Sequence, residues 1–514
     1  MSIDLPKAKS VAENPTQDEM REWALAHLSP RAQITEFGNV NYASQVTARL
    51  KKSTFFVADE EIYQQHISRV EAKEWARRQD EYIADQDMIL IEGYIGPDPE
   101  FRTGARLYIE KRQANVPAMQ EQLYFPKDAL WEPEFTVIYT PGLKAPGKPD
   151  DRLITVDHDT YVTRVFGSDY FGESKMGGLR MWNKLVFDRG GLALHAGCKV
   201  FPAEDNSEGR EKCALIIGLS GTGKTTTTFC QQLGSLPVQD DFVALMPGGT
   251  IHTSENGCFA KTYGLDPHDE PTIYGGVTRR DAWLENVGVD PKTGKVDFFD
   301  TSHTANGRAT FPLANIRHRD PRNLPEADCL LILNRNENII PAVAKLKRDQ
   351  AAAYFVLGET KGTSAGGAAE DGRNLRVPGT NPFFFNNDAW QGNRLLELLD
   401  TLPDLEVYLL NTGRVGGPET NGDSKKVKIS DSSAIVHAIV EKTIMWEDDP
   451  DFGYSVAASV PEVDDIELLQ PRRLYERCGR LDEYMQRVAG LKLERIAYLE
   501  AFRGLERSIV AAVR

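Results

Sequence analysis

The sequence has few cysteines, no long apolar run and no excess of positive charge. Its six cysteines form no CxxC pair, which argues against both a disulfide framework and a structural zinc site and fits a reducing compartment. No stretch approaches the roughly 18 apolar residues that a membrane-spanning helix needs, and residues 1–19 lack the apolar core of a signal peptide. We therefore expect a cytoplasmic protein without a membrane partner.

The charge balance is acidic throughout the 514 residues. There are 60 Lys and Arg against 76 Asp and Glu, which gives a formal net charge of −16. Such a field repels nucleic-acid phosphates, so we expect no nucleic-acid partner. The hydrophobic content of 41% and the charged content of 26% are those of a folded globular protein, and the length predicts more than one domain.

The pattern along the chain predicts a mixed α/β protein with two domains. Residues 1–190 form the first, because apolar, strand-like runs bounded by turn residues recur there. Residues 191–514 form the second, which begins with the apolar run 191–201. Predicted strands lie at 53–57, 88–96, 135–142, 153–158, 160–167, 191–201, 213–218, 236–246 and 329–335, and predicted helices at 18–27, 60–85 and within 471–514. Residues 358–382 are rich in Gly and small polar side chains, as in a loop or lid.

A glycine-rich loop follows the apolar run that ends at Ile217. The string GLSGTGKT satisfies GxxxxGK[ST] and stands between a predicted strand and a predicted helix, where a phosphate-binding loop must stand. Its glycines let backbone N–H groups converge on phosphate oxygens at a helix N-terminus. Lys224 is expected to reach the β- and γ-phosphates and Thr225 to bind the metal of the metal–nucleotide complex. The candidate nucleotide-binding residues are Gly218, Leu219, Ser220, Gly221, Thr222, Gly223, Lys224, Thr225 and Thr226.

Two adjacent carboxylates, Asp240 and Asp241, end the next apolar run. Hard divalent cations prefer oxygen ligands, and adjacent carboxylates crowd unfavourably without one. Asp pairs also occur in ordinary turns, so the pair gains its functional interpretation from the phosphate loop. The loop by itself leaves the phosphate acceptor open, because kinases, hydrolases and switch proteins share it.

The extended string GLSGTGKTTTT at 218–228 resembles the kinase loop of ATP-dependent phosphoenolpyruvate carboxykinases. Further segments resemble this family in the same order, over roughly residues 47–470. They are 93–102 (GYIGPDPEFR), 170–175 (YFGESK), 194–196 (LHA), 240–241 (DD), 257–261 (GCFAK), 270–271 (EP), 284–287 (LENV), 304–308 (TANGR), 411–413 (NTG) and 416–417 (GG).

This resemblance implies a two-domain fold with a nucleotide-binding C-terminal domain and an active site in the cleft between the domains. It implies the gluconeogenic reaction in which oxaloacetate and ATP give phosphoenolpyruvate, ADP and carbon dioxide, with Mg²⁺ and Mn²⁺ as cofactors. By position, the residues that resemble the dicarboxylate-binding set are Arg49, Tyr170 and Arg308. Those that resemble the metal and phosphate set are Lys175, His195, Lys224, Thr225, Asp240 and Asp241, and those that resemble nucleotide contacts include Ser220, Lys261 and Glu270.

The chemistry of these residue types fits the implied roles. Arginine offers a planar fork for carboxylates, and a metal held by His195 and Asp241 would stabilise the enolate that decarboxylation leaves. Without the resemblance, each has an ordinary interpretation as well. His195 would be a core histidine, Arg49 and Arg308 surface arginines, and Tyr170 a half-buried aromatic.

The sequence also departs from the family pattern. Where the family carries two lysines after the Tyr-Gly-Gly-Glu segment, this chain has Lys175-Met176, and a thioether is a poor ligand for Mn²⁺. The family's Glu-His-Gly after the aspartate pair is replaced at Phe242-Val243, its arginine-lysine pair reads Lys425-Lys426, and the lid segment is longer. The replacement of the second lysine by Met176 leaves three alternatives. Either Lys175 shifts to bind the metal in its place, or a water molecule replaces the missing ligand, or the second metal site is lost.

Three functions are compatible with the sequence. The first is an ATP-dependent phosphoenolpyruvate carboxykinase with an altered metal site. The second is a diverged kinase on the same scaffold that phosphorylates another small acid or alcohol, which Met176 and the lid favour. The third is a nucleotide-binding protein without turnover, and the presence of the whole substrate-binding set argues against it.

Overall fold

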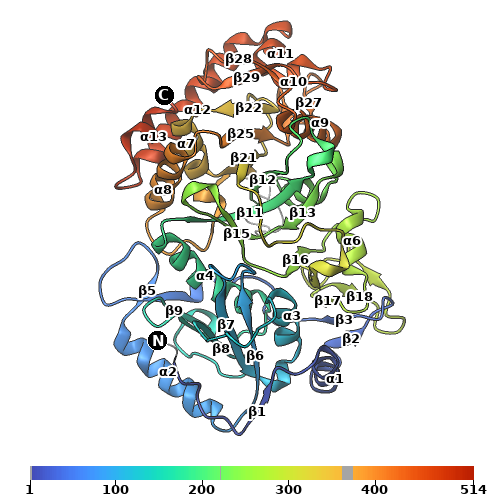
Figure 1. Ribbon diagram of the computed structural model, residues 1–514, viewed down its shortest axis with the longest axis vertical. Coiled ribbons are helices and arrows are strands. Elements are labelled where there is room, and N and C mark those ends of the chain that lie inside the picture. Colours follow the sequence, from blue (N-terminus) through green and yellow to red (C-terminus); the bar gives the residue numbers. More distant parts are fainter. Residues whose placement is uncertain (1–2, 220, 362–373) are drawn as a thin grey trace. The chain divides into compact units, whose positions relative to one another are not determined.

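The structure is a computed structural model that describes residues 3–219, 221–361 and 374–514 (Figure 1). The chain folds into two compact units. Unit 1 comprises residues 1–189, 252–318 and 383–386, and unit 2 comprises residues 190–251, 319–382 and 387–514. Residues 252–318 and 383–386 thus pack in unit 1, although the pattern along the chain predicted them in the second domain. Strand pairing explains the first of these, because Trp283–Glu285 pairs with Val40–Tyr42.

Unit 1 contains a large mixed sheet with the strand order β1-β6-β7-β8-β10-β9-β4-β5. The predicted strands at 53–57, 88–96, 135–142, 153–158 and 160–167 are confirmed as members of it. The strands are β1 (Ser10–Glu13), β4 (Thr54–Val57), β5 (His66–Ile67), β6 (Asp87–Ile95), β7 (Thr103–Glu110), β8 (Phe135–Thr140), β9 (Leu153–Asp157) and β10 (Val162–Phe166).

A second sheet of unit 1 has the order β16-β20-β17-β3-β2 and carries several candidate site residues. Its strands are β2 (Ala32–Ile34), β3 (Val40–Tyr42), β16 (Gly257–Lys261), β17 (Trp283–Glu285) and β20 (Arg308–Pro312), beside the pair β18 (Gly288–Val289) and β19 (Val296–Asp297). The helices of this unit are α1 (Gln17–Leu28), α2 (Arg69–Ile83), α3 (Asn115–Leu123), α4 (Gly172–Asp188) and α6 (Pro271–Val277).

The helix predicted at 18–27 is confirmed as α1, whereas the one predicted from Glu60 begins only at Arg69. Ser68 caps its N-terminus by accepting a hydrogen bond from the Glu71 backbone N–H, and the two residues before Ser68 pair with β4 instead. The helical periodicity of the sequence therefore predicted the helix correctly but not its first residue, which is set by the N-cap side chain of Ser68.

The main sheet of unit 2 runs β14-β11-β12-β21-β25-β22-β29-β28, with β13 also paired to β11. It contains the predicted strands at 191–201, 213–218 and 329–335, while the run 236–246 forms two strands broken at the aspartate pair. The strands are β11 (Leu192–Phe201), β12 (Lys212–Ile217), β13 (Leu236–Gln239), β14 (Phe242–Leu245), β21 (Ala327–Asn334), β22 (Val343–Leu346), β25 (Glu406–Asn411), β28 (Met445–Asp448) and β29 (Ser455–Ser459). Strand β15 (Ile251–Thr253), which pairs with β14, lies where the chain passes from unit 2 to unit 1.

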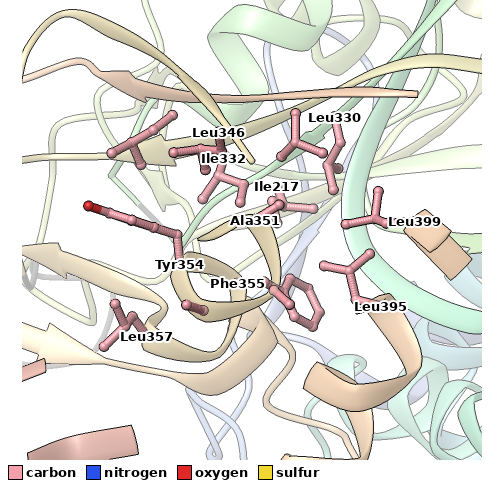
Figure 2. Close-up of a cluster of buried hydrophobic side chains, with 14 of the residues drawn as sticks. Ile217, Leu330, Ile332, Leu346, Ala351, Tyr354, Phe355, Leu357, Leu395 and Leu399 are labelled. Atoms are coloured by element: carbon pink, nitrogen blue, oxygen red, sulfur yellow. The ribbon is translucent and has the colours of Figure 1, made fainter. Parts of the chain in front are cut away.

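Helices cover both faces of this sheet. They are α5 (Lys224–Phe229), α7 (Arg348–Leu357), α8 (Asp388–Thr401), α9 (Ile429–Val440), α10 (Ile466–Leu469), α11 (Pro471–Arg477), α12 (Leu481–Glu500) and α13 (Arg507–Ala511). Alternate residues of β12 enter opposite cores: Leu215 and Ile217 pack with α7, α8 and α12, and Ala214 and Ile216 with α9, α10 and α11. Figure 2 shows Ile217, Leu330 and Ile332 gathered with the side chains of α7 and α8. A strand buried on both faces explains why 213–217 is continuously apolar.

The mixed α/β class predicted from the sequence is confirmed. In the parts of the chain that the structure describes, no helix combines the length and apolarity that crossing a membrane requires. The predicted C-terminal helical region consists of α11, α12 and α13, separated at Gly479 and Gly504, whose φ angles of 68° and 86° end a helix readily.

Candidate active-site residues

The phosphate loop of unit 2 joins β12 to α5. Gly221 and Gly223 have φ angles of 86° and 87°, the left-handed region that other residues rarely adopt. A side chain on Gly218 would clash, since its Cβ would lie 2.4 Å from Thr222 Oγ1. The loop therefore has the strand–turn–helix context that the motif requires, and Lys224 and Thr225 are the first residues of α5. Ser220, predicted to contact the nucleotide, lies outside the described residues.

Asp240 connects the phosphate loop to the strand pair that follows it. Lys224 Nζ donates to the Asp240 carbonyl oxygen (2.9 Å), and Thr225 Oγ1 donates to Asp240 Oδ2 (2.6 Å). The other carboxylate oxygen, Oδ1, is buried, lies 3.9 Å from Lys224 Nζ, and makes no hydrogen bond to any described residue. Burial raises the pKa of Asp240, and Lys224 and Thr225 oppose this rise. Asp240 thus receives the loop's lysine at its main-chain carbonyl oxygen and the loop's threonine at its carboxylate.

The next residue, Asp241, faces His195 on β11. His195 Nε2 lies 3.1 Å from Asp241 Oδ1, and His195 Nδ1 lies 2.9 Å from the carbonyl oxygen of Thr380. A carbonyl oxygen only accepts, so Nδ1 carries the proton of the neutral ring and Nε2 presents its lone pair. Burial, followed by the charge of Lys224, lowers the pKa of His195, so the ring is neutral at pH 7.

These donors fit a divalent cation. A neutral imidazole nitrogen and a carboxylate oxygen 3.1 Å apart are both acceptors and repel each other unless a proton or a cation lies between them. The Thr380 carbonyl fixes the ring in the way that outer partners of metal-binding histidines do. Among the described residues no three His, Cys, Asp or Glu side chains gather as a metal cluster. A metal here would therefore complete its coordination with hydroxyl, phosphate or water oxygens.

Two contacts to the loop were not predicted from the sequence. Arg335 Nη1 donates to the Gly221 carbonyl oxygen (2.9 Å), and Thr412 Oγ1 donates to the Thr222 carbonyl oxygen (2.8 Å). Strands β12, β21 and β25 run parallel, so their carboxyl ends meet at one edge of the sheet. Arg335 and Thr412 each directly follow one of these strands, which is the signal that could have identified them.

Lys199 on β11 is a further residue that sequence reasoning missed. Its side chain is fully buried and donates to the carbonyl oxygens of Thr227 (2.9 Å) and Cys230 (2.6 Å) and to Gln232 Oε1 (2.6 Å). The first two acceptors belong to the C-terminal end of α5, where a cation opposes the negative end of the helix dipole. Lys199 thus anchors the helix that begins with the phosphate-loop lysine.

We expect the stability of the protein to depend on the titration of Lys199. Desolvation lowers its pKa from 10.5 to about 7, so between pH 7 and 10.5 the unfolded chain binds more protons than the folded one. The contribution of Lys199 to the free energy of unfolding must therefore rise as the pH increases from 7 to 10.5. Thermal unfolding midpoints of the parent protein, measured from pH 6 to 9 relative to Lys199→Met, should increase above pH 7. A pH-independent difference would contradict this assignment.

In unit 1, Lys261, Arg308 and Glu285 lie side by side across three strands. Arg308 on β20 is directly opposite Lys261 on β16 and opposite Glu285 on β17, so the three share one face of the sheet. Desolvation, then repulsion by Arg308, lowers the pKa of Lys261, and burial raises the pKa of Glu285 well above its usual value. Arg308 Nε is buried and makes no hydrogen bond to the described residues. We call these residues, with Tyr170 and Lys175, the Arg308 cluster.

Phe259 on β16 brings Lys175 of α4 to the same place as Arg308. The Arg308 guanidinium carbon lies 5.3 Å and Lys175 Nζ 5.4 Å from the centre of the Phe259 ring. Lys175 Nζ also donates to both carboxylate oxygens of Glu255, at 2.5 and 2.7 Å, and both side chains are nearly buried. The predicted metal-binding lysine is therefore held by a carboxylate in unit 1. Met176, the next residue, is 7% exposed.

Asn306 connects Tyr170 to the segment that contains Arg49. Its side-chain amide donates to Tyr170 Oη (3.4 Å) and to the Thr47 carbonyl oxygen (2.7 Å). Glu173 strengthens this link, because it accepts from the Leu50 backbone N–H (2.6 Å). Burial raises the pKa of Tyr170, while Arg308 opposes the rise. The Arg49 segment, Tyr170 and Arg308 are thus brought together within unit 1, and Arg49 lies over the Phe383 ring at 5.5 Å.

The remaining predicted residues lie elsewhere in their units. Glu270 precedes α6 in unit 1, and Lys261, predicted as a nucleotide contact, belongs to the Arg308 cluster. Lys425, which stands where the family has arginine, bonds to Asp465 (2.7 Å) and Glu467 (2.6 Å) in unit 2. Much of the predicted lid, 362–373, is outside the described residues. Strands β23 (Glu359–Lys361) and β24 (Asn374–Arg376) pair with each other on either side of it.

Comparison with known proteins gives a consistent match. A protein-family model described as phosphoenolpyruvate carboxykinase matches residues 9–466. Two curated relatives from Moorella thermoacetica are named phosphoenolpyruvate carboxykinase (ATP) 1 and 2. The first is 30% identical over 432 residues, which is 81% of this chain and 79% of the relative, and the second is 29% identical over 457 residues, 85% and 82% of the two chains. A relative from Pelobacter propionicus with the name phosphoenolpyruvate carboxykinase (ATP) is 28% identical over 425 residues, 80% and 77% of the two chains.

Proposed function

Because the chain belongs to the family of ATP-dependent phosphoenolpyruvate carboxykinases, we propose that it converts oxaloacetate and ATP to phosphoenolpyruvate, ADP and carbon dioxide. In this reaction the bond between C3 and the departing carboxylate of oxaloacetate breaks, carbon dioxide leaves, and the resulting enolate oxygen takes the γ-phosphoryl group of ATP. We further propose that the enzyme works in the cytoplasm in the gluconeogenic direction. Both proposals extend the family assignment.

The main support for the proposal is that Asp240 and Asp241 contact different groups. Asp240 accepts from Thr225 and from Lys224 of the phosphate loop, whereas Asp241 pairs with the neutral His195. Asp240 therefore belongs to the nucleotide-phosphate site, while its neighbour Asp241 forms with His195 a nitrogen–oxygen donor pair that suits a second cation. A simple ATPase has need of the first only, whereas decarboxylation followed by phosphoryl transfer uses both.

The donor sets indicate which residues would hold which cation. Thr225 and Asp240 offer oxygen atoms that suit the Mg²⁺ of an ATP complex, and His195 with Asp241 suits Mn²⁺. When bound, these ions supply charge that stabilises an enolate and the transferring phosphoryl group. Lys224 would neutralise the phosphates, and the backbone N–H groups of the loop would hold them in position.

The Arg308 cluster is the proposed dicarboxylate site. Arg308 has a buried Nε without a hydrogen bond to the described residues, and a carboxylate is the planar acceptor that satisfies such a fork. Tyr170 and Arg49 belong to the segments that Asn306 ties together. We propose that these side chains bind oxaloacetate and, by resemblance, that Lys261 is a nucleotide contact. Glu270 remains a proposed nucleotide contact by resemblance.

Met176 distinguishes this chain from the family pattern. Moving Lys175 to the missing ligand position would break its buried ion pair with Glu255, and breaking such a pair costs about 3–5 kcal/mol. We therefore propose that Lys175 stays with Glu255 and that water takes the place of the missing amine. Because Met176 weakens the case for carbonyl chemistry, a kinase acting on another small acid is the second candidate function.

A Mn²⁺-dependent assay with oxaloacetate and ATP tests the proposal. Formation of phosphoenolpyruvate and carbon dioxide in equal amounts supports it. ATP consumption that requires some other acceptor, with no phosphoenolpyruvate formed, would instead support the second candidate.

We expect Met176→Lys to bind Mn²⁺ about 10-fold more tightly or better, because by resemblance the family carries a metal-binding lysine at this position. Met176→Leu is the matched control, since it keeps the volume and adds no ligand. Electron paramagnetic resonance titration of free Mn²⁺ measures the affinity of each variant. Equal Mn²⁺ affinity in the lysine and leucine variants would show that residue 176 does not face the metal.

A further inference from the structure

A cavity of about 470 Å³ lies in unit 1 between α1, the turn after α6 and the start of β17. Its floor includes Trp283, which is 3% exposed, and its rim carries the exposed side chains of Arg279 and Arg280. This volume is typical of sites for small metabolites. The cavity shares no lining residue with the phosphate loop or with the Arg308 cluster.

Three guanidinium groups line this cavity. Arg21 is oriented by two backbone acceptors, the carbonyl oxygens of Gly38 and of Arg280 (3.4 Å). Arg279 and Arg280 form no ion pair with any described residue, in a chain whose acidic side chains outnumber the basic ones. Desolvation, then repulsion by Arg280, lowers the pKa of Arg21. Arg21 and Arg280 thus lie close enough to repel each other.

Two carboxylates, those of Asp18 and Asp281, complete the lining of the cavity and determine its net charge. Asp18 attracts Arg21, and Asp281 accepts from Asn315 Nδ2 (2.9 Å). Three guanidiniums against two carboxylates leave a net positive charge within an acidic protein. An anion would relieve the repulsion between Arg21 and Arg280, and phosphate or carboxylate groups match the arginine fork.

We propose that this cavity binds a small polyanionic metabolite through the guanidinium groups of Arg21, Arg279 and Arg280. Its position suggests how an occupant acts on the protein. Trp283 is the first residue of β17, and the third, Glu285, pairs with Arg308 and accepts from the Phe171 backbone N–H (2.8 Å). A ligand that fixes Trp283 therefore stiffens the strand that supports the Arg308 cluster.

Calorimetric titration of the Lys224→Ala variant of the 514-residue chain tests the proposal, because that background weakens the phosphate loop as a competing anion site. Pyrophosphate and citrate are the two probes, one for phosphate and one for carboxylate chemistry. Saturable binding of either probe, weakened at least 10-fold by Arg279→Gln with Arg280→Gln, is the expected result. Arg77→Gln with Arg78→Gln, an adjacent pair on α2 with the same loss of charge, should leave the affinity unchanged.

Hydrogen–deuterium exchange locates the bound probe. Protection on binding is expected in residues 17–24 and 279–285. No saturable binding of either probe, an equal affinity after the paired Arg279 and Arg280 substitutions, or protection confined to other segments would overturn the proposal. Because none of these measurements depends on turnover, the result does not depend on the proposed reaction.

Discussion

Replacing Lys224 by alanine should lower the rate of phosphoryl transfer about 10³-fold or more while the protein stays folded. Lys224 is the first residue of α5, and its ammonium group lies between the loop and Asp240. Single groups that neutralise charge in a transition state typically contribute factors of this size. Coupled measurement of phosphoenolpyruvate formation in the parent and the variant checks the loss.

The lysine also has a structural contact, so the control must separate folding from catalysis. Its hydrogen bond to the Asp240 carbonyl oxygen is one contact at the edge of the sheet, and we expect the thermal midpoint to change little. Lys492→Ala removes the same charge from α12 and should keep full activity. Retained transfer in Lys224→Ala, or a loss of activity that only accompanies unfolding, would remove the phosphate loop from the proposed mechanism.

The sequence predicted the phosphate loop well because its physical requirements are local. The apolar strand, the glycines with left-handed φ angles and the helix that begins at Lys224 are adjacent in the chain. His195 was available only through the resemblance, and its pairing with Asp241 could not be predicted, because that pairing arises from the contact of β11 with β14, which are more than forty residues apart. Spacing along the chain carries no information about such a contact.

The structure of unit 1 explains why its boundaries could not be read from the sequence. Strand β17 pairs with β3 across about 240 residues, so residues 252–318 complete a sheet that begins near Ala32. Lys199 was overlooked for a related reason. A lysine in an apolar strand has no local signature, and its function at the end of α5 depends on three acceptors from a later segment.

The replacement of a metal-binding lysine by Met176 is understood only when the sequence and the structure are considered together. The resemblance implies that Met176 stands where the family has a metal-binding lysine, and the structure adds that Lys175 is already paired with Glu255. Side chains on this part of α4 are buried, so neither residue is simply exposed to solvent. The family assignment and the unusual ligand set are therefore compatible if the metal relies on His195, Asp241 and water.

Arg308→Gln should lower kcat/KM for oxaloacetate about 100-fold or more and leave the KM for ATP nearly unchanged. Truncating one partner of a buried, hydrogen-bonded charge pair typically costs about 2–5 kcal/mol, and a 100-fold loss, about 2.7 kcal/mol, lies in the lower part of that range. Arg308→Lys should restore little activity, because an ammonium group keeps the charge but loses the planar fork. Arg317→Gln, an exposed arginine of the same unit, is the control for loss of charge.

A second readout separates a direct role of Arg308 from a structural one. Repulsion by Arg308 contributes to the lowered pKa of Lys261, so removing the guanidinium group should raise that pKa. The Arg308→Gln variant should therefore retain its residual activity to higher pH than the parent on the basic side of the pH profile. If kcat/KM for oxaloacetate and the pH profile both stay at parent values, Arg308 does not bind the substrate. If instead activity and thermal stability fall together and the basic limb does not move, its role is to hold the sheet of β16, β20 and β17.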